Sequence, residues 1–358
     1  MTTVTGARPD ELWFTRCPVP TATGIAADLG LLAAEFADEG ITVRSLQDVP
    51  ADVAGDHHYT HALPGLFREG GNVPALWARA RGEATRLVGL TWIEESQAIL
   101  VRADSGVDTP ERLRGLRLAV PRHDIAIDFW RAMALHGFAG ALSLAGAELS
   151  DARLVDVPAT RESGQWEAEL AALGRGDVDA VYVKGALAVE TAARHGAVVG
   201  VDLDAVADAR VRVNNGTPRP ITVHQDLLDH HPDLVTRFLA VLVGAAEWAA
   251  GHPADVARIL GAETGAGAVG VAGAYREFGP STLRIDLSDE RLDLLARQER
   301  FLRGQGFLAA PVDVRAWAAR EPLDDARALA ARRPPTSRAP HPRDLELPST
   351  ATLEASHD

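Results

Sequence analysis

The segment from Trp13 to Thr23 carries the side chain with the strongest nucleophilic character, since Cys17 is the only cysteine among 358 residues. The residue pattern places Cys17 where a short apolar strand ends and a helix begins, and Arg16 precedes it. A helix N-terminus and a neighbouring guanidinium both favour the thiolate form of a cysteine. Turns at the carboxyl ends of strands are also where open α/β sheets bind ligands. We therefore expect Cys17 to be reactive, although most free cysteines are small buried hydrophobic residues.

Two other places hold residues that could bind or react. The polar segment 47–71 contains the histidines His57, His58 and His61 and ends in two glycines. The histidines could be an incidental loop cluster or a metal site, but zinc would need a further ligand such as Asp56, and we expect no metal. Lys184 is the one basic residue that is not arginine. Either a compact, titratable ammonium is needed there, or one surface lysine has survived by chance.

The composition excludes several classes of partner. The formal net charge of −14 argues against nucleic acids and anionic membrane surfaces. Residues 1–9 lack the apolar stretch of a signal peptide, and no uninterrupted apolar run of about 18 residues predicts a membrane span. We therefore expect a soluble, cytoplasmic monomer that binds a small molecule and needs no cofactor.

Short apolar strands alternate with helical periodicity along the first two thirds of the chain. The expected strands are 11–16, 41–46, 85–92, 97–103, 117–121, 153–157, 179–183, 197–203 and a long connecting strand at 211–223. The expected helices are 24–39, 74–84, 124–137, 165–173, 186–195, 234–251, 253–260 and 287–304, and 47–71 reads as a loop. This alternation predicts an α/β protein with parallel sheets built from βαβ units.

Several segments carry a family resemblance. The strand, RCPVP turn and helix at the start, with the later segments DTPERLRGLRLAV, ALGRGDVDAVYV and HPDLVTRFLAVLVGAAEWAAGHPADV, are similar to type II periplasmic binding proteins for sulfonates and thiamine precursors. Within that superfamily the chain resembles the 2'-hydroxybiphenyl-2-sulfinate desulfinases from about residue 12 to about residue 322. RCPVP and HYTHALPGLFREGG are the most specific segments of this match.

The resemblance implies a two-lobed fold with parallel or mixed sheets that closes on its ligand. Lobe 1 is expected at 10–103 plus 212–330, lobe 2 at 104–211, and a disordered Pro-rich tail at 331–358. The hinge strands are expected at 99–103 and 211–221. In such a fold the ligand lies in the cleft between the lobes, and closure expels water from the reacting group.

The resemblance also implies a catalytic set of Cys17, His58 and Arg68, with Gly71 offering a backbone N–H. These residue types suit a sulfinate, because a guanidinium can hold two of its oxygens and an imidazole can accept the thiol proton. Gly70 and Gly71 lack a Cβ, so their backbone can approach the oxyanion closely. Cys17 could attack the sulfur, or it could give its proton to the ring carbon as sulfite departs; the sequence does not choose between the two.

Four further residues are expected to contact the substrate: Thr21, His61, Tyr182 and Lys184. Lys184 stands where the desulfinases carry a tryptophan, and a cation there suits a substrate with a second negative group, such as a carboxylate. We therefore expect a desulfinase that hydrolyses an aryl or related sulfinate and releases sulfite. The alternative is a cytoplasmic solute-binding protein that captures a sulfonate-like anion without converting it.

Overall fold

The structure is a computed structural model that describes residues 6–15, 19–54, 56–160, 164–275, 283–334 and 336. The predicted reactive residue Cys17 therefore lies outside the described residues. The same is true of almost all of the expected Pro-rich tail, of which only 331–334 and 336 are described.

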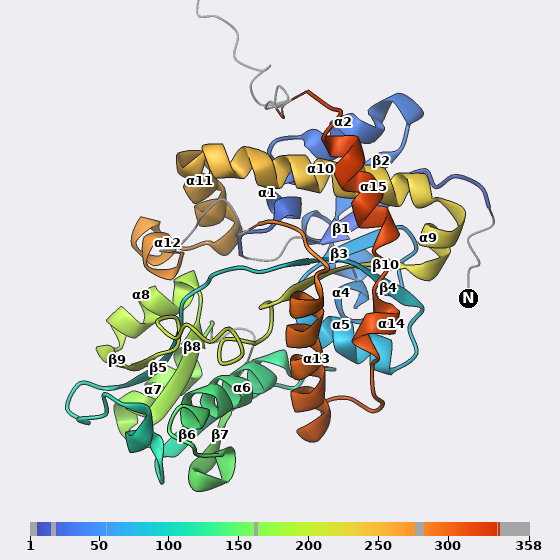
Figure 1. Cartoon of the computed structure of the whole chain (residues 1–358). Coiled ribbons are helices and arrows are strands. Elements are labelled where there is room, and N and C mark those ends of the chain that lie inside the picture. The colour runs from blue at the N-terminus through green and yellow to red at the C-terminus, as the bar shows by residue number, and fades with distance from the viewer. Residues whose placement is uncertain are drawn as a thin grey trace, which may run out of the picture.

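Two five-stranded sheets, one in each half of the molecule, form the framework (Figure 1). The first sheet has the order β2-β1-β3-β10-β4, with strands Thr42–Ser45, Glu11–Thr15, Leu66–Glu69, Arg219–His224 and Thr85–Thr91. The second has the order β7-β6-β8-β5-β9, with strands Arg153–Pro158, Arg117–Arg122, Ala180–Lys184, Gln97–Arg102 and Ala197–Asp202. The predicted α/β class is confirmed.

Both sheets are mixed. In each sheet, one strand that follows a connection between the two sheets is antiparallel to both of its neighbours. In the first sheet β1 is parallel to β2 and β3, whereas β10 lies between β3 and β4 and is antiparallel to both. In the second sheet β6 is parallel to β7 and β8, whereas β5 lies between β8 and β9 and is antiparallel to both. The chain crosses from the first sheet to the second just before β5 and returns just before β10, so the antiparallel strands are the ones that follow these two crossings.

The helices cover the sheets and agree with most of the predicted ranges to within a few residues. In the first half they are α1 Ala22–Asp28, α2 Leu31–Phe36, α3 Ala51–Ala54, α4 His57–Thr60, α5 Asn72–Ala80, α9 Gln225–His230, α10 Pro232–Gly251, α11 Pro253–Thr264, α14 Val314–Trp317 and α15 Glu321–Ala330. Beside or between the halves lie α6 Phe129–Ser143, α7 Glu167–Arg175, α8 Ala186–Arg194, α12 Ala268–Ala274 and α13 Asp289–Gly304.

Three predicted elements differ from the structure. The helix expected at 24–39 is divided at Gly30, whose φ of 72° is left-handed and separates α1 from α2. The expected loop 47–71 contains strand β3, which gains its hydrogen bonds from β1 and β10. The expected strand 211–223 is regular only from Arg219, because a turn at Asn214–Thr217 precedes it.

Two segments of the chain cross between the sheets. The strand Gln97–Arg102 pairs with β8 and β9, so it belongs to the second sheet. The first crossing is therefore the short segment 92–96 between β4 and β5, and the second is the longer segment 203–218 between β9 and β10. The expected hinge strands 99–103 and 211–221 lie next to these crossings, and the expected lobe division stays a prediction.

Helix α10 is the core helix of the first half. Its Phe238 stacks on Phe67 of β3 with ring centroids 3.8 Å apart, and α15 crosses over it (Figure 1). By length and composition α10 is the one described helix that could span a membrane, but 56% of its most apolar window is buried inside the protein. The sequence prediction found no such span because Arg237 and Glu247 interrupt the apolar run.

Helix α13 ties the two halves together through a buried histidine. The ring of His136, in α6, stacks on Phe301 of α13 at a centroid distance of 4.0 Å. His136 is buried, and this burial lowers the pKa of its imidazole to about 3, although the nearby Gln298 side chain acts in the opposite direction.

This pKa predicts how acid destabilises the fold. Between pH 6.5 and about 3 the unfolded chain binds a proton at His136 that the folded chain does not, so stability is complete above pH 6.5 and falls as the pH decreases. His136→Phe keeps the ring stack and removes the proton, so its loss of unfolding free energy towards pH 4 should be shallower by about 1.4 kcal/mol per pH unit. Denaturant unfolding between pH 7 and 4 measures this slope.

The control His252→Phe, at an exposed histidine stacked on Trp248, should leave the slope unchanged. Equal slopes for wild type and His136→Phe would contradict the account.

Candidate functional site

A cavity of about 180 Å³ lies between the two sheets and receives residues from both halves and both crossings. The first half contributes His58 from α4 and Gly71 at the N-terminus of α5, together with Val19. The second half contributes an aromatic wall and the end of β8. The crossings contribute the polar residues Glu95 and Asn215, and Arg219 lies at the start of β10.

His58 is a neutral base in the wall of this cavity. Burial lowers the pKa of His58 well below 6.5, and the guanidinium groups of Arg68 and Arg219 lower it further. Its Nδ1 is buried and has no hydrogen-bond partner in the described chain. The imidazole is therefore unprotonated near neutral pH and able to accept a proton.

Arg68 lies directly behind this wall rather than in it. The residue is 1% exposed in the centre of β3, and its Nε donates to the carbonyl of His58 at 2.7 Å. Its Nη1 donates to the carbonyl of Gly71 at 3.1 Å. Arg68 thereby holds His58 and Gly71 in place, and both of these predicted site residues line the cavity.

The two glycines have different roles. The N–H of Gly70 donates to the carbonyl of Pro220 at 3.2 Å, so it is not directed at a ligand. A Cβ on Gly70 would lie 3.0 Å from the guanidinium of Arg68, which packs over it. Gly71 lines the cavity, and a Cβ there would collide with the amide of Asn215. Asn215 in turn accepts a hydrogen bond from the N–H of Val73 at 3.1 Å, which joins the second crossing to the start of α5.

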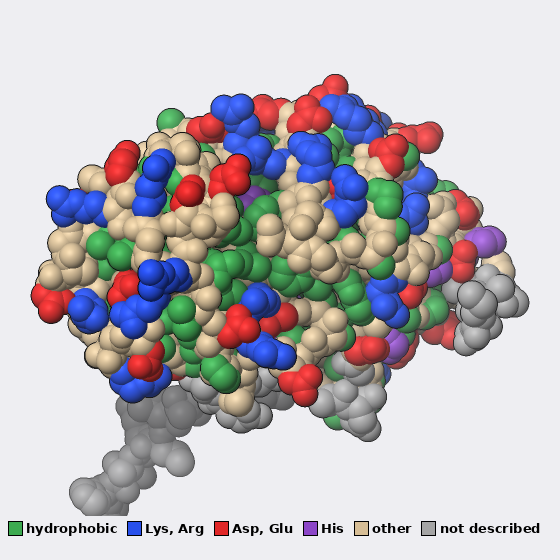
Figure 2. All heavy atoms as spheres, turned by 90° about the horizontal axis from the view of Figure 1, so that it is seen from below, with side chains coloured by type: hydrophobic (Ala, Val, Ile, Leu, Met, Phe, Trp, Pro, Cys, Tyr) green, Lys and Arg blue, Asp and Glu red, His purple; other side chains and the backbone are tan. Residues whose placement is uncertain are grey.

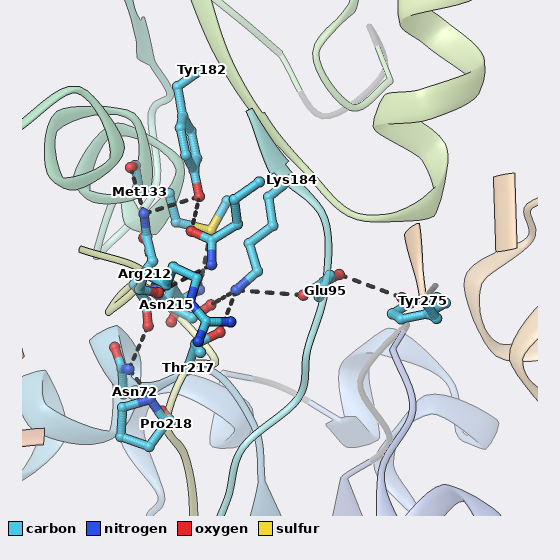
Figure 3. Close-up of polar contacts among 12 residues, drawn as sticks. Asn72, Glu95, Met133, Tyr182, Lys184, Arg212, Asn215, Thr217, Pro218 and Tyr275 are labelled. Atoms are coloured by element: carbon cyan, nitrogen blue, oxygen red, sulfur yellow. Dashed lines mark hydrogen bonds and ion pairs between the residues drawn. The ribbon is translucent and has the colours of Figure 1, made fainter. Parts of the chain in front are cut away.

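Lys184 lies at the end of β8 and joins the two crossings (Figure 3). Its Nζ is 3.4 Å from Oε2 of Glu95, in the first crossing. The same Nζ donates to the carbonyl of Asn215 at 3.0 Å and to Oγ1 of Thr217 at 2.7 Å, in the second crossing. Burial lowers the pKa of Lys184, and the carboxylate of Glu95 acts in the opposite direction. The ammonium therefore makes two hydrogen bonds and one ion pair within the described chain.

The other three residues predicted to bind substrate do not line the cavity in the described chain. Thr21 caps α1, and its Oγ1 accepts from the N–H of Gly24 at 2.9 Å. His61 is buried beside Thr222, with Nε2 2.9 Å from its Oγ1, and burial lowers the pKa of His61 to about 3. The hydroxyl of Tyr182 donates to Gln97 at 2.9 Å and accepts from Asn214 at 3.0 Å (Figure 3).

Several cavity residues were not anticipated from the sequence. Phe129, Trp130 and Trp166 form the aromatic wall, with ring centroids 5.1 and 5.3 Å apart in succession. Phe129 was expected in the core or in a pocket wall, but the tryptophans, Glu95, Asn215 and Arg219 were not considered. The position of Arg219 between two prolines at the start of an apolar run is the one local signal that could have drawn attention to it.

A buried carboxylate holds the start of α1 in place. Glu69, at the end of β3, accepts from the N–H and the hydroxyl of Thr23 at 3.0 and 2.6 Å and from the hydroxyl of Thr91 at 3.0 Å. The hydroxyl of Thr15, at the end of β1, donates to the Glu69 carbonyl at 3.2 Å. Glu69 therefore fixes both described ends of the segment that contains Cys17.

Within the described residues, no three His, Cys, Asp or Glu side chains come together as metal ligands. His57, His58 and His61 are therefore not joined by Asp56 into such a group. The surface seen in Figure 2 carries acidic and basic side chains side by side, with hydrophobic side chains between them. With a net charge of −14, the molecule must attract an anion through local cations.

Comparisons with known proteins agree with this geometry. A family model described as NMT1/THI5 like matches residues 36–256. The 2'-hydroxybiphenyl-2-sulfinate desulfinase of Rhodococcus erythropolis is 31% identical over 88% of this chain and 93% of its own length. A crystal structure of a cysteine-to-serine mutant of DSZB in complex with biphenyl-2-sulfinic acid covers 89% of this chain and 99% of that one, at 27% identity and a TM-score of 0.70. The periplasmic aliphatic sulphonate binding protein SsuA of Escherichia coli shares the fold, with a TM-score of 0.67 at 16% identity over 97% of this chain and 99% of that one.

The close approach at Gly71 gives a stability prediction. Gly71→Ala forces the Asn215 side chain away and breaks its hydrogen bond to Val73, so the free energy of unfolding should fall by about 1–3 kcal/mol. Denaturant unfolding measures the change. The matched control is Gly174→Ala in α7, where no heavy atom lies within 4 Å of an added Cβ. That variant should be unchanged or more stable by up to about 1 kcal/mol. An equally stable Gly71→Ala would contradict this account of the site.

Proposed function

Because the chain belongs to the NMT1/THI5-like family and to the family of the 2'-hydroxybiphenyl-2-sulfinate desulfinases, we propose that it hydrolyses the carbon–sulfur bond of an aryl sulfinate in the cavity between its lobes. The products are the arene and sulfite. As a member of this enzyme family it is a hydrolase of carbon–sulfur bonds.

One observation carries the proposal: a neutral imidazole, aromatic rings and buried cations line the same cavity. The rings of Phe129, Trp130 and Trp166 offer an apolar wall for an aryl group. His58 is ready to accept a proton, and the two nearby guanidinium groups make its surroundings positive. The aromatic wall suits the aryl ring of the substrate, the positive surroundings suit its oxyanion, and His58 suits the proton transfer of the reaction.

The reaction balances with water alone: an aryl sulfinate and water give the arene and hydrogen sulfite. In one route the Cys17 thiolate bonds to sulfur, the carbon–sulfur pair leaves with the ring carbon, which takes a proton, and water then hydrolyses the sulfur–sulfur bond. In the other route the Cys17 thiol protonates the ring carbon, sulfur dioxide leaves, and its hydration to hydrogen sulfite returns a proton to the thiolate. No external oxidant or reductant is needed in either route.

Cys17 is the reactive thiol of the proposal. It lies outside the described residues, but Val19, two residues later in the chain, lines the cavity. The segment is fixed on both sides by Glu69, through Thr15 and Thr23. His58 would take or return the thiol proton, and Arg68 would hold His58 and Gly71 in place beside the sulfinate.

A binding protein without catalysis is the second candidate, because the fold is shared with the sulphonate binding protein SsuA. That likeness concerns the fold alone. The neutral His58 favours catalysis, since binding an anion calls for donors and positive charge rather than for a base.

The test is sulfite release from benzenesulfinate and biphenyl-2-sulfinate. Wild type should release one sulfite per sulfinate consumed, and Cys17→Ser and Cys17→Ala should each reduce the rate by about 100-fold or more. Because Cys17 is the only cysteine, alkylation with iodoacetamide should inactivate wild type and leave the residual activity of Cys17→Ser unchanged.

The opposite result identifies the binding protein. Stoichiometric binding of either sulfinate without sulfite release, and with the same affinity in Cys17→Ser, would overturn the desulfinase proposal. A thermal unfolding curve of each variant shows whether it folds, so that a loss of activity is assigned to the thiol.

A further inference from the structure

Arg219 is a buried cation in the cavity wall that pairs with no described residue. The residue lines the cavity and is 4% exposed. None of the described residues forms a hydrogen bond or an ion pair with its guanidinium, and its buried Nε has no partner. A buried, unpaired guanidinium is costly unless a ligand compensates it.

The charge of Arg219 acts on cavity residues from both halves of the molecule. Burial lowers the pKa of His58 and of Lys184, and the guanidinium of Arg219 lowers both further. Lys184 already has an anionic neighbour, because its Nζ is 3.4 Å from Oε2 of Glu95. Of the two long basic side chains among the described lining residues, Arg219 is therefore the one left for a ligand.

The fold places Arg219 rigidly rather than leaving it to search for a partner. The turn that precedes it is closed by two backbone hydrogen bonds of 2.9 Å between Asn214 and Thr217. Lys184 holds the same turn, since its Nζ donates to Oγ1 of Thr217 at 2.7 Å (Figure 3). Gly216, with a φ of 86°, lies under the guanidinium, where any Cβ would collide with Nη2 of Arg219. The charge is thus preorganised, which is the property of a binding group.

Arg68, which the family resemblance implied as the anion-binding arginine, is placed differently. It is 1% exposed and donates to the carbonyls of His58 and Gly71 at 2.7 and 3.1 Å. It is not among the described residues that line the cavity, whereas Arg219 is. Arg68 therefore positions the wall, and Arg219 forms part of it.

A second unpartnered donor lines the same cavity. Trp166 is 2% exposed, and its Nε1–H has no hydrogen-bond partner in the described chain. Its φ of 67° is unusual for a bulky residue, and such backbone strain is concentrated at functional sites. The aromatic wall therefore presents a polar donor as well as an apolar surface.

We infer that Arg219 is the residue that binds the sulfinate group of the substrate. A sulfinate carries one negative charge, which one guanidinium matches, and its two oxygens fit the planar fork of the arginine side chain. The aryl group then lies against Trp130 and Trp166 in the same cavity. The inference rests on the proposed desulfinase function, which names the substrate, and adds the residue that holds its charge.

The experiment measures the binding of biphenyl-2-sulfinate by calorimetry in Cys17→Ser, which lacks the thiol of the proposed reaction. Adding Arg219→Gln should weaken this binding by about 30-fold or more, and Arg219→Lys should recover part of the loss. The neutral analogue 2-(methylsulfonyl)biphenyl keeps both rings and two oxygens, and its affinity should change by less than about 3-fold. Arg210→Gln is the matched control, because Arg210 is an exposed arginine of the second crossing that pairs with Asp208, and it should bind as Cys17→Ser does.

Thermal unfolding without ligand is the second readout. Arg219→Gln removes an uncompensated buried charge, so its melting temperature should equal or exceed that of Cys17→Ser. An arginine that only supports the fold would give a lower melting temperature when it is replaced.

Three outcomes would overturn the inference. If Arg219→Gln binds biphenyl-2-sulfinate within about 3-fold of Cys17→Ser, or if Cys17→Ser does not bind this ligand, Arg219 is not the sulfinate-binding residue. If Arg219→Gln weakens both ligands equally or lowers the melting temperature, Arg219 supports the fold instead.

Failure of the proposed function is seen separately, in the sulfite assay with wild type. A selective loss of sulfinate binding in Arg219→Gln, together with no sulfite release by wild type, would leave Arg219 as the anion-binding residue of a protein that does not convert its ligand.

Discussion

The buried ammonium of Lys184 is the contact on which the geometry of the cleft depends. Both segments that connect the lobes pass beside it, and its three donors reach Glu95 in one and Asn215 and Thr217 in the other. A buried ammonium with two hydrogen bonds and an ion pair fixes these segments more firmly than dispersed surface pairs would. The lobes are therefore joined through one charged centre, and the cavity is built around it.

The same centre explains why the cavity suits an anion in an acidic protein. Lys184 and Glu95 cancel each other, whereas the guanidinium groups of Arg68 and Arg219 keep the surroundings of His58 positive. Burial lowers the pKa of His58 and this field lowers it further, so the imidazole is neutral beside an anionic substrate.

The sequence predicted the positions of the helices and strands better than it predicted which strands pair in the sheets. The central residues of strands such as Arg117–Arg122 and Ala180–Lys184 are apolar, which predicts buried strands from local pattern alone. Strand β3 was missed because it is short and ends in Arg68 and Glu69, whose burial depends on β1 and β10. No local pattern reveals such tertiary pairing.

The site was anticipated in the same partial way. His58, Gly71 and Lys184 line the cavity, and the family resemblance or the rarity of lysine had pointed to each of them. The place of Arg219 in the cavity wall could not be read from the sequence, because it depends on how β10 and the second crossing fold. Three residues that were expected to contact the substrate do not line the cavity: Thr21, His61 and Tyr182. Nearness to the expected site in the sequence or in the lobe was not enough to predict a place in the cavity wall. The lobe division, the cytoplasmic location and the monomeric state stay predictions.

The most direct measurement is a crystal structure of Cys17→Ser with bound biphenyl-2-sulfinate. The account predicts that the sulfinate lies in the interlobe cavity beside His58, with the aryl rings against Trp130 and Trp166. A ligand bound outside this cavity, or inside it with no anionic group near His58, would contradict the account.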